Sequence, residues 1–432
     1  MAAVQTTAVV TSFLLRRGPG GPRILFLRRS ARVGTYRGRW AGISGYLEGP
    51  DPLAQALREI EEETGLPPTA LSLLRAGEPL VAADPRLGRL WLVHPFLFAL
   101  APGHEPRLDW EHTRARWARP ETVFRLPTVP RLPETLQRVY PLVPPSVEAA
   151  AETIASDRSR GARQLAAAAL EALAAVAPAP PVRLRAAACY LARARPGIPA
   201  IALAVAHAYS RALGSSDPSS SLREAAGRLE GTAREAALQA ASVLPAGTVL
   251  TYSRSSTVLL ALLARRPARV LLSEGRPGQE GLQMARELAR AGIDVTLVAD
   301  AQLPGLVAEA EAVAVGADAI LADGSFLNKA GTMPLALTAR RLRVPVYVVA
   351  ESWKVLPPGV RPFPEEGDPA EVAPPLTGVT VRNPYFETTP GPLVTAYLTE
   401  EGALTPAALR PKALAAREAW RRLFGRSRAD LA

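Results

Sequence analysis

The 432-residue sequence contains one cysteine, Cys189, and only three lysines among 51 basic residues. A single cysteine excludes an intramolecular disulfide and a cysteine-rich metal site. This usage is typical of cytoplasmic proteins, and we expect that location. Asparagine is equally rare, at Asn328 and Asn383 alone. Because Asn328 is followed by Lys329 in a chain that avoids both residue types, we interpret the two as candidate functional residues.

Long apolar runs without charge are also missing, so the sequence predicts no membrane-spanning helix and no membrane partner. No basic segment precedes the apolar stretch near the N-terminus, which we interpret as a first strand and not as a signal peptide. Aromatic residues make up only 6% and do not alternate with basic ones. The net charge of +11 comes from arginines spread along the chain, which favours a solvated surface over nucleic-acid binding.

Composition divides the chain into four segments. Residues 1–140 mix apolar strands with one helix, and a proline-rich linker follows at 141–148. Residues 149–243 are alanine-rich with helical patterns, which predicts a helical subdomain. Residues 244–432 alternate strands and helices, which is typical of a Rossmann-like, doubly wound parallel sheet. The predicted fold class is α/β, and the length and 48% hydrophobic content allow such cores.

The stretch "REIEEETGL", residues 58–66, puts three glutamates on one face of a predicted helix at 52–64. Glu59, Glu62 and Glu63 stand at i, i+3 and i+4, where like charges repel unless a cation lies among them. Carboxylate oxygens suit Mg²⁺, which also binds substrate phosphates. A solvated acidic face explains the same run without a metal, and Arg58 can offset part of its charge by pairing with Glu62.

This stretch resembles the second half of the Nudix box, G-x5-E-x7-R-E-U-x-E-E-x-G-U, where U is apolar, and matches every fixed position of that half. The first half departs: it is one residue short and reads Gly45-x5-Asp51-x6-Arg58. The resemblance covers about residues 5–140. It implies a Nudix α/β/α sandwich that hydrolyses a nucleoside diphosphate derivative with Mg²⁺ or Mn²⁺ as cofactor.

The same resemblance implies roles for single side chains. Glu59, Glu62 and Glu63 would hold the metal, and Arg58 would orient their carboxylates. Glu111, in "LDWEHTRARW", stands where Nudix proteins often carry another acid and would be a further ligand or base. Metals in such sites polarise the diphosphate and activate water for attack at phosphorus.

Polar residues follow five predicted strands of the C-terminal segment, at Ser253–Ser256, Glu274–Arg276, Asp300, Asp318 and Glu351–Lys354. In a doubly wound sheet these strand ends meet at one edge, where ligands bind. Ser253, Arg254 and Ser255 lead into a helix whose first N–H groups suit a phosphate. Helix capping by serine, without any ligand, is the alternative interpretation.

Seven stretches resemble, in order and spacing, the α/β/δ regulatory subunits of translation initiation factor 2B and their isomerase relatives. Those relatives are ribose-1,5-bisphosphate isomerase and methylthioribose-1-phosphate isomerase. The resemblance covers about residues 148–410, and it implies a homodimer formed through this domain. The stretches are "TIASDRSRGARQLA", "ARPGIPA", "VLTYSRSSTV", "LLSEGRPGQEG", "VGADAILADGSFLNKAGT", "YVVAESWK" and "NPYFETTP".

The isomerases use a cysteine in the first strand–helix turn and an aspartate in the "GAD" stretch as an acid–base pair. The aspartate is present as Asp318, but Ser253 replaces the cysteine, and a serine hydroxyl does not titrate near neutral pH. We therefore expect a site that binds a phosphorylated sugar or nucleotide without isomerising it. Arg276, Asn328 and Lys329 match ligand-contacting motifs of the family and are expected to bind phosphate.

Three hypotheses for the whole chain follow. In the leading one, a Nudix hydrolase of an ADP-ribose-like compound or a sugar nucleotide is fused to a binding domain that does not isomerise. In the second, the C-terminal domain still isomerises through Asp318 and another base. In the third, the chain is a non-enzymatic regulatory protein with a decayed Nudix domain. A role in translation follows from the family name only.

Overall fold

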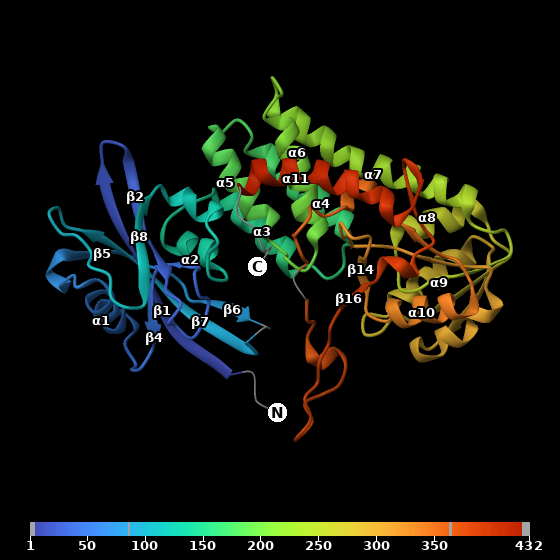
Figure 1. Ribbon diagram of the computed structural model, residues 1–432, viewed down its shortest axis with the longest axis horizontal. Helices are drawn as coiled ribbons and strands as arrows, with labels where there is room; N and C mark the ends of the chain where they lie inside the picture. Colours follow the sequence, from blue (N-terminus) through green and yellow to red (C-terminus); the bar gives the residue numbers. More distant parts are fainter. Residues whose placement is uncertain (1–4, 85–86, 363–364, 426–432) are drawn as a thin grey trace.

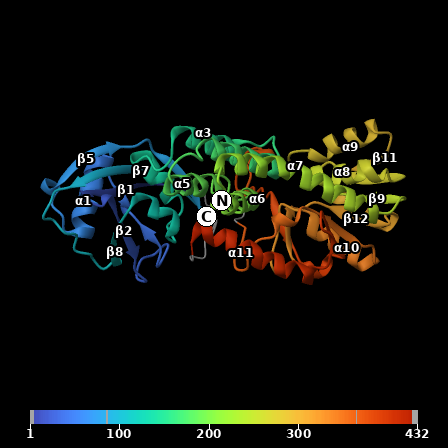
Figure 2. The same cartoon turned by 90° about the horizontal axis from the view of Figure 1, so that it is seen from above.

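The computed structural model describes residues 5–84, 87–362 and 365–425. A strand-rich N-terminal unit, a central group of helices and a C-terminal α/β unit follow one another along the long axis (Figure 1). The view from above shows the same order (Figure 2). Within these described ranges, no helix is both long and apolar enough to cross a membrane.

The N-terminal unit is built on an eight-stranded sheet with the main order β3-β2-β1-β7-β5. Strand β4 pairs with β1, β6 with β7, and β8 with β2. The long strands β1 and β7 pair in parallel and form the centre of the sheet. The strands are β1 Gln5–Gly18, β2 Gly21–Arg29, β3 Trp40–Ala41, β4 Ile43–Tyr46, β5 Leu71–Ala76, β6 Leu80–Asp84, β7 Arg89–Leu100 and β8 His112–Ala118.

Helix α1, Pro52–Thr64, has the bounds that the sequence predicts. The Asp51 carboxylate caps its N-terminus by accepting hydrogen bonds from two first-turn N–H groups at 2.9 and 3.2 Å. Gly65 ends the helix at a φ of 64°, which residues with a side chain rarely adopt. Buried Ala56 and Ile60 share a core with β1, β2 and β7, so α1 is fixed against the sheet.

The central helices share one hydrophobic core with the N-terminal unit. Phe13 and Phe26 of the sheet belong to this core, and so do Leu142 and Val143 from the predicted linker. The Gln137 side chain accepts hydrogen bonds from the N–H groups of these two linker residues. The helices are α2 Leu132–Val139, α3 Pro145–Ser156, α4 Ala162–Ala175, α5 Pro181–Ala192, α6 Pro199–Ala212, α7 Pro218–Val243 and the C-terminal α11 Arg410–Phe424.

The C-terminal unit contains a seven-stranded sheet in the order β11-β10-β9-β12-β15-β17-β18. All neighbours pair in parallel except β17 and β18, which confirms the predicted doubly wound sheet. The strands are β9 Thr248–Leu250, β10 Arg269–Ser273, β11 Asp294–Val298, β12 Ala312–Val315, β15 Val346–Val349, β17 Ala396–Thr399 and β18 Gly402–Leu404. Helices α8 Ser256–Arg265, α9 Glu280–Arg290 and α10 Thr332–Leu342 connect the strands.

The strand order reverses between β9 and β12, which are neighbours although far apart in sequence. The loops that leave such a pair diverge to opposite faces and open a crevice. Beside it, a small antiparallel sheet consists of β13 Ala319–Ile320, β14 Phe326–Lys329 and β16 Phe386–Thr389. The topology therefore brings the segments after β9, after β12 and in β14 to one edge.

Candidate functional site

An N-terminal pocket of about 240 Å³ lies beside β4 and next to strands β1, β6 and β7. One part of its lining is acidic and another is aromatic. The acidic residues are Glu48, Glu59 and Glu111, and the aromatic residues are Tyr36, Tyr46 and Trp91. Two of the predicted site residues, Glu59 and Glu111, are thus brought together from α1 and from the segment before β8.

Glu59 packs directly against Gly45 of β4. A Cβ atom at Gly45 would stand 1.8 Å from Glu59 Oε1, so only glycine leaves room for this carboxylate. Gln55, one helical turn earlier, donates from Nε2 to Glu59 Oε1 at 2.6 Å. Burial raises the pKa of Glu59, and neighbouring carboxylates act in the same direction. Both named residues of the Gly-x5-Asp half therefore have a structural role. Gly45 leaves room for the Glu59 carboxylate, and Asp51 caps the N-terminus of α1.

The other glutamates of α1 point in different directions. Glu62 is exposed, whereas Glu63 is buried at 5% exposure. Glu63 Oε1 accepts a hydrogen bond from the Ser44 N–H at 3.1 Å, and its Oε2 has no hydrogen-bond partner among the described residues. His112 Nδ1 lies 3.6 Å from that oxygen. Burial raises the pKa of Glu63 well above its ordinary value, so its charge lacks full compensation.

Arg58 is exposed and donates a hydrogen bond to Gln55. Because Gln55 in turn bonds to Glu59, Arg58 reaches a carboxylate through the amide. Glu111 also lines the pocket, and its N–H donates to Asp109 Oδ1 at 3.0 Å. Burial and the Asp109 charge raise the pKa of Glu111.

The donor chemistry of this pocket fits a hard divalent cation. Its carboxylates are oxygen ligands of the kind that Mg²⁺ and Mn²⁺ prefer. Within the described ranges, no arginine or lysine forms an ion pair with Glu59, Glu62 or Glu111. In the same part of the chain, no three His, Cys, Asp or Glu side chains converge closely enough to hold a metal ion as they stand. The three glutamates of the predicted metal face therefore lie on one helix, but their carboxylates do not converge on a common point.

A C-terminal cleft of about 290 Å³ lies at the ends of β9 and β12. It collects residues from both sheets of the C-terminal unit and from the central helices. The predicted residues that line it are Ser253, Arg254, Ser255, Asp318, Asn328 and Lys329. Arg276 does not line the cleft: it is exposed, and its backbone N–H donates to Asp300 Oδ2 at 2.7 Å.

The turn after β9 has the geometry of a helix start. Ser255 Oγ accepts a hydrogen bond from the Val258 N–H at 3.3 Å and caps α8, as the alternative interpretation predicts. Ser253 adopts a φ of 57°, a conformation that costs free energy for a residue with a side chain. Arg254 turns to Glu287 of α9, with 3.0 Å between nitrogen and oxygen. Ser253 is therefore the residue of this turn that lies in a strained backbone conformation at the cleft.

Asp318 remains partly exposed to the cleft, and desolvation raises its pKa to about 6. The positive charge of Lys354 opposes this rise. Lys354 Nζ donates to the Ala317 carbonyl at 3.0 Å and pairs with the fully buried Glu351 at 2.7 Å. A carboxyl group in this range exchanges protons near neutral pH, which suits an acid or base.

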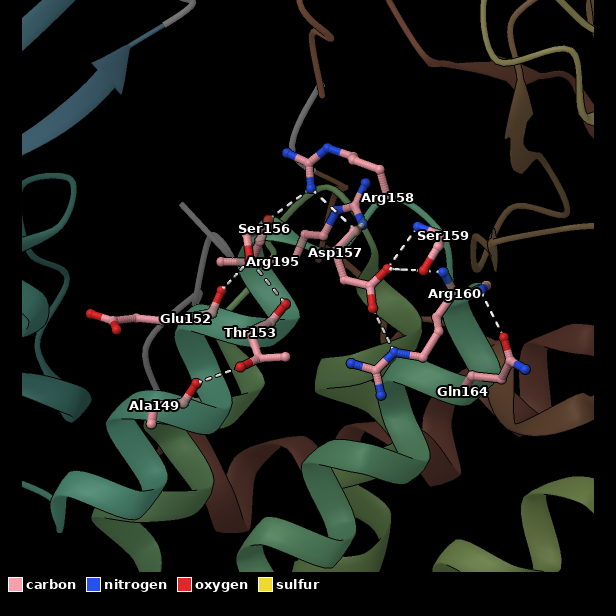
Figure 3. Close-up of polar contacts among 12 residues, drawn as sticks. Ala149, Glu152, Thr153, Ser156, Asp157, Arg158, Ser159, Arg160, Gln164 and Arg195 are labelled. Carbon is pink, nitrogen blue, oxygen red and sulfur yellow. Dashed lines mark hydrogen bonds and ion pairs between the residues drawn. The ribbon is translucent and has the colours of Figure 1, made fainter.

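Sequence reasoning missed a group of arginines that line the cleft. Figure 3 shows three of them, Arg158, Arg160 and Arg195, near Asp157. The Asp157 carboxylate accepts hydrogen bonds from Ser159 and Arg160, and these bonds hold its pKa well below the usual range. Arg195 donates to the Asp157 carbonyl and pairs with Glu365 at 2.6 Å. The signal was present in the quoted "SDRSRGARQ" and "ARPG" stretches, whose arginines are Arg158, Arg160, Arg163 and Arg195.

The fold and the two sites define a fusion of an acid-lined α/β domain with a Rossmann-like domain that has a basic cleft. Two family models match the chain: the NUDIX domain over residues 6–139 and the Initiation factor 2 subunit family over residues 158–406. The chain belongs to the Initiation factor 2 subunit family and carries a NUDIX domain ahead of it. Both predicted resemblances are confirmed.

Curated relatives match the C-terminal part. The ribose 1,5-bisphosphate isomerase of Archaeoglobus fulgidus is 38% identical over 169 residues, which are 37% of this chain and 54% of that protein. The chain thus spans about half the length of that relative. The methylthioribose-1-phosphate isomerase of Anaeromyxobacter sp. is 39% identical over 271 residues, 55% of this chain and 79% of that protein.

Solved structures give the same fold. The translation initiation factor eIF-2B of Pyrococcus horikoshii OT3 superposes with a TM-score of 0.52 at 29% identity, over 61% of this chain and 98% of that one. The 5-methylthioribose 1-phosphate isomerase of the same organism has a TM-score of 0.51 at 25% identity, over 63% and 87%. The predicted fold class is confirmed.

Proposed function

We propose that the NUDIX domain is a Mg²⁺- or Mn²⁺-dependent hydrolase of a nucleoside diphosphate derivative, either ADP-ribose-like or a sugar nucleotide. The observation that carries the proposal is that three carboxylates line one pocket, those of Glu48, Glu59 and Glu111, without an ion-paired arginine or lysine among the described residues. Glu59, Glu62 and Glu63 would hold the metal, and Glu111 would act as a further ligand or base. When bound, the ion supplies polarisation of the diphosphate and activation of water. Gln55 orients Glu59 for this role.

A substrate panel with Mg²⁺ or Mn²⁺ tests the hydrolase: ADP-ribose, NADH, sugar nucleotides, nucleoside triphosphates and capped diphosphates. We expect turnover of at least one diphosphate compound by the full chain. Glu59→Gln should lower kcat by more than about a hundredfold, because losing a metal ligand costs several kcal/mol at the transition state. Glu61→Gln is the matched control, since Glu61 is exposed on the same helix and should leave kcat unchanged. No turnover of any compound would contradict the proposal.

For the C-terminal domain we propose binding of a phosphorylated sugar or nucleotide without isomerisation. Ser253, Arg254, Ser255, Asn328 and Lys329 would contact the ligand at the strand ends. The charge of the cleft supports a phosphate ligand, and the printed names of the isomerase relatives support a sugar phosphate. A homodimer through this domain and a cytoplasmic location belong to the same proposal.

Isomerisation is the second candidate function, favoured by the pKa of Asp318 near 6 within the cleft. The same protein should be given ribose 1,5-bisphosphate and 5-methylthioribose 1-phosphate. Turnover that Asp318→Asn abolishes would establish an isomerase. Thermal stabilisation by these ligands without turnover would support a binding domain alone.

A further inference from the structure

Arg195 is buried, whereas the other arginines that line the C-terminal cleft are at least partly exposed. Its Nη1 group donates to the Asp157 carbonyl (Figure 3). Nε and Nη2, which form the second edge of the guanidinium, both donate to Glu365 Oε1, at 3.1 and 2.6 Å. A carboxylate of the chain itself therefore holds the second edge of this arginine.

The contact leaves half of the Glu365 carboxylate unsatisfied. Its Oε2 atom is buried and has no hydrogen-bond partner in the part of the chain that the structure describes. A buried carboxylate oxygen without a donor costs free energy. Gly197 provides the space, since a Cβ atom there would lie 2.1 Å from Glu365 Oε2 and 2.6 Å from Glu365 Cβ. The ion pair with Arg195 is therefore accommodated closely but stabilised incompletely.

Glu365 begins a segment, residues 365–385, whose two ends are paired with each other. The Tyr385 N–H donates to the Glu365 carbonyl at 3.1 Å. Tyr385 lines the cleft, and its ring centroid lies 5.3 Å from Lys329 Nζ. The segment therefore contacts two cations of the cleft, one through the Glu365 carboxylate and the other through the Tyr385 ring.

The second edge of Arg195 has the chemistry of a phosphate site. Two parallel N–H donors on a guanidinium bind either a carboxylate or a phosphate. A phosphate monoester carries a charge of about −1.5 to −2 at pH 7 and three acceptor oxygens, so it competes well with a single carboxylate. Burial raises the pKa of Asp318 to about 6, and the Glu365 charge acts in the same direction. The Glu365 charge is therefore felt by the acidic group of the cleft.

We propose that Glu365 is an internal competitor at an anion subsite formed by Arg195, and that a phosphate group of the ligand displaces it. The proposal rests on the binding function proposed for the C-terminal domain and adds a control to it. Displacement releases the 365–385 segment from Arg195, so ligand binding loosens this segment. Because an uncharged sugar cannot replace the carboxylate, the cleft selects ligands that carry phosphate. The apparent affinity is lowered by the fraction of molecules in which Glu365 holds the subsite.

Glu365→Gln tests the competition directly in the full chain. Inorganic phosphate and ribose 1,5-bisphosphate are titrated without divalent metal, and Kd is taken from the ligand dependence of Tm. We expect Kd for both ligands to fall about tenfold, because the competing charge is gone. Gly197→Ala should act in the same direction, since its Cβ displaces Glu365 without removing the charge. Glu366→Gln is the matched control: Glu366 pairs with the exposed Arg382 and should leave Kd unchanged.

Hydrogen exchange of the 365–385 segment supplies a readout that does not depend on affinity. Phosphate should speed exchange of the Tyr385 amide in the wild type, and in Glu365→Gln the exchange should be fast without ligand. Slower exchange with phosphate would mean that the segment closes over the ligand, and it would overturn the proposal.

The binding data separate this inference from the proposed binding function. Equal or weaker binding by Glu365→Gln, with clear binding by the wild type, would overturn the competition and leave the binding function standing. Binding by Glu365→Gln alone would uphold the competition. Lack of binding by every variant would overturn both. If Gly197→Ala fails to fold, Glu365→Gln and its control still decide the outcome.

Discussion

At the residue scale, Gly45 of β4 leaves the space in which the Glu59 carboxylate lies. Gly45→Ala places a Cβ where the Glu59 carboxylate lies, so that side chain has to move. We expect kcat for the NUDIX substrate to fall at least tenfold, with the free energy of unfolding little changed, because the displaced group is the end of a flexible side chain. Gly49→Ala is the control, because no atom lies within 4 Å of its added Cβ. Equal behaviour of the two variants would show that Gly45 has no such role.

Asp318 gives a pH dependence of known sign. Its folded pKa is about 6 and its ordinary value is 3.8, so the folded state holds the proton more tightly than the unfolded state. Stability therefore falls as pH rises from about 4 to 6, by at most about 3 kcal/mol, and is level above. Urea unfolding should show that Asp318→Asn gains stability relative to wild type across this window. A difference that stays constant with pH would contradict the raised pKa.

Asp323→Asn is the matched control for that titration. Hydrogen bonds from Ser325 lower the pKa of Asp323, so its contribution to stability is lost only as pH falls below its ordinary value. Relative to wild type, this variant should show no slope between pH 4 and 6. A similar slope in both variants would assign the effect to the charge of the region and not to Asp318.

At the scale of elements, helix α1 shows how far sequence patterns reach. Its bounds, Pro52–Thr64, agree with the predicted helix at 52–64, and its glutamates were predicted to share one face. Each residue turns the helix by about 100°, so Glu59, Glu62 and Glu63 spread over a broad arc. The sheet lies against one side of that arc: Glu63 is buried with Ile60, while Glu62 is left exposed. The spacing of the glutamates in the sequence does not show which of them the sheet covers.

The C-terminal cleft shows the same limit over longer distances. Alternating strands and helices predicted the parallel sheet, and with it the edge where Ser253 and Asp318 meet. The positions of the arginines that line the cleft depend on ion pairs such as that of Arg195 with Glu365, which are 170 residues apart in sequence. No local periodicity records such a contact. Arg276 was expected in the cleft because it follows a strand and matches a ligand-contacting motif of the family. Its backbone N–H donates to Asp300, and the residue does not line the cleft.

At the scale of the molecule, one hydrophobic core joins the N-terminal unit to the central helices, so we expect the two to unfold together. Helix α2 lines the N-terminal pocket with Leu132 and Thr135, and it contributes Leu136 and Val139 to the shared core. The far end of α11 reaches the same junction, where Arg193 lies over the rings of Phe124 and Phe424. A shift of the central helices would therefore move α2, which lines the N-terminal pocket.

This arrangement predicts how the chain unfolds. Leu142, 1% exposed, lies in the segment that composition marks as a linker, so Leu142→Ala should cost about 2–5 kcal/mol through the cavity it leaves. Ser146→Ala, at an exposed position four residues on, should cost less than about 0.5 kcal/mol. Urea unfolding followed by far-UV circular dichroism and by hydrolase activity should give coincident midpoints that shift together in Leu142→Ala. Separate midpoints, or a neutral Leu142→Ala, would mean that the two parts are independent domains on a flexible connection.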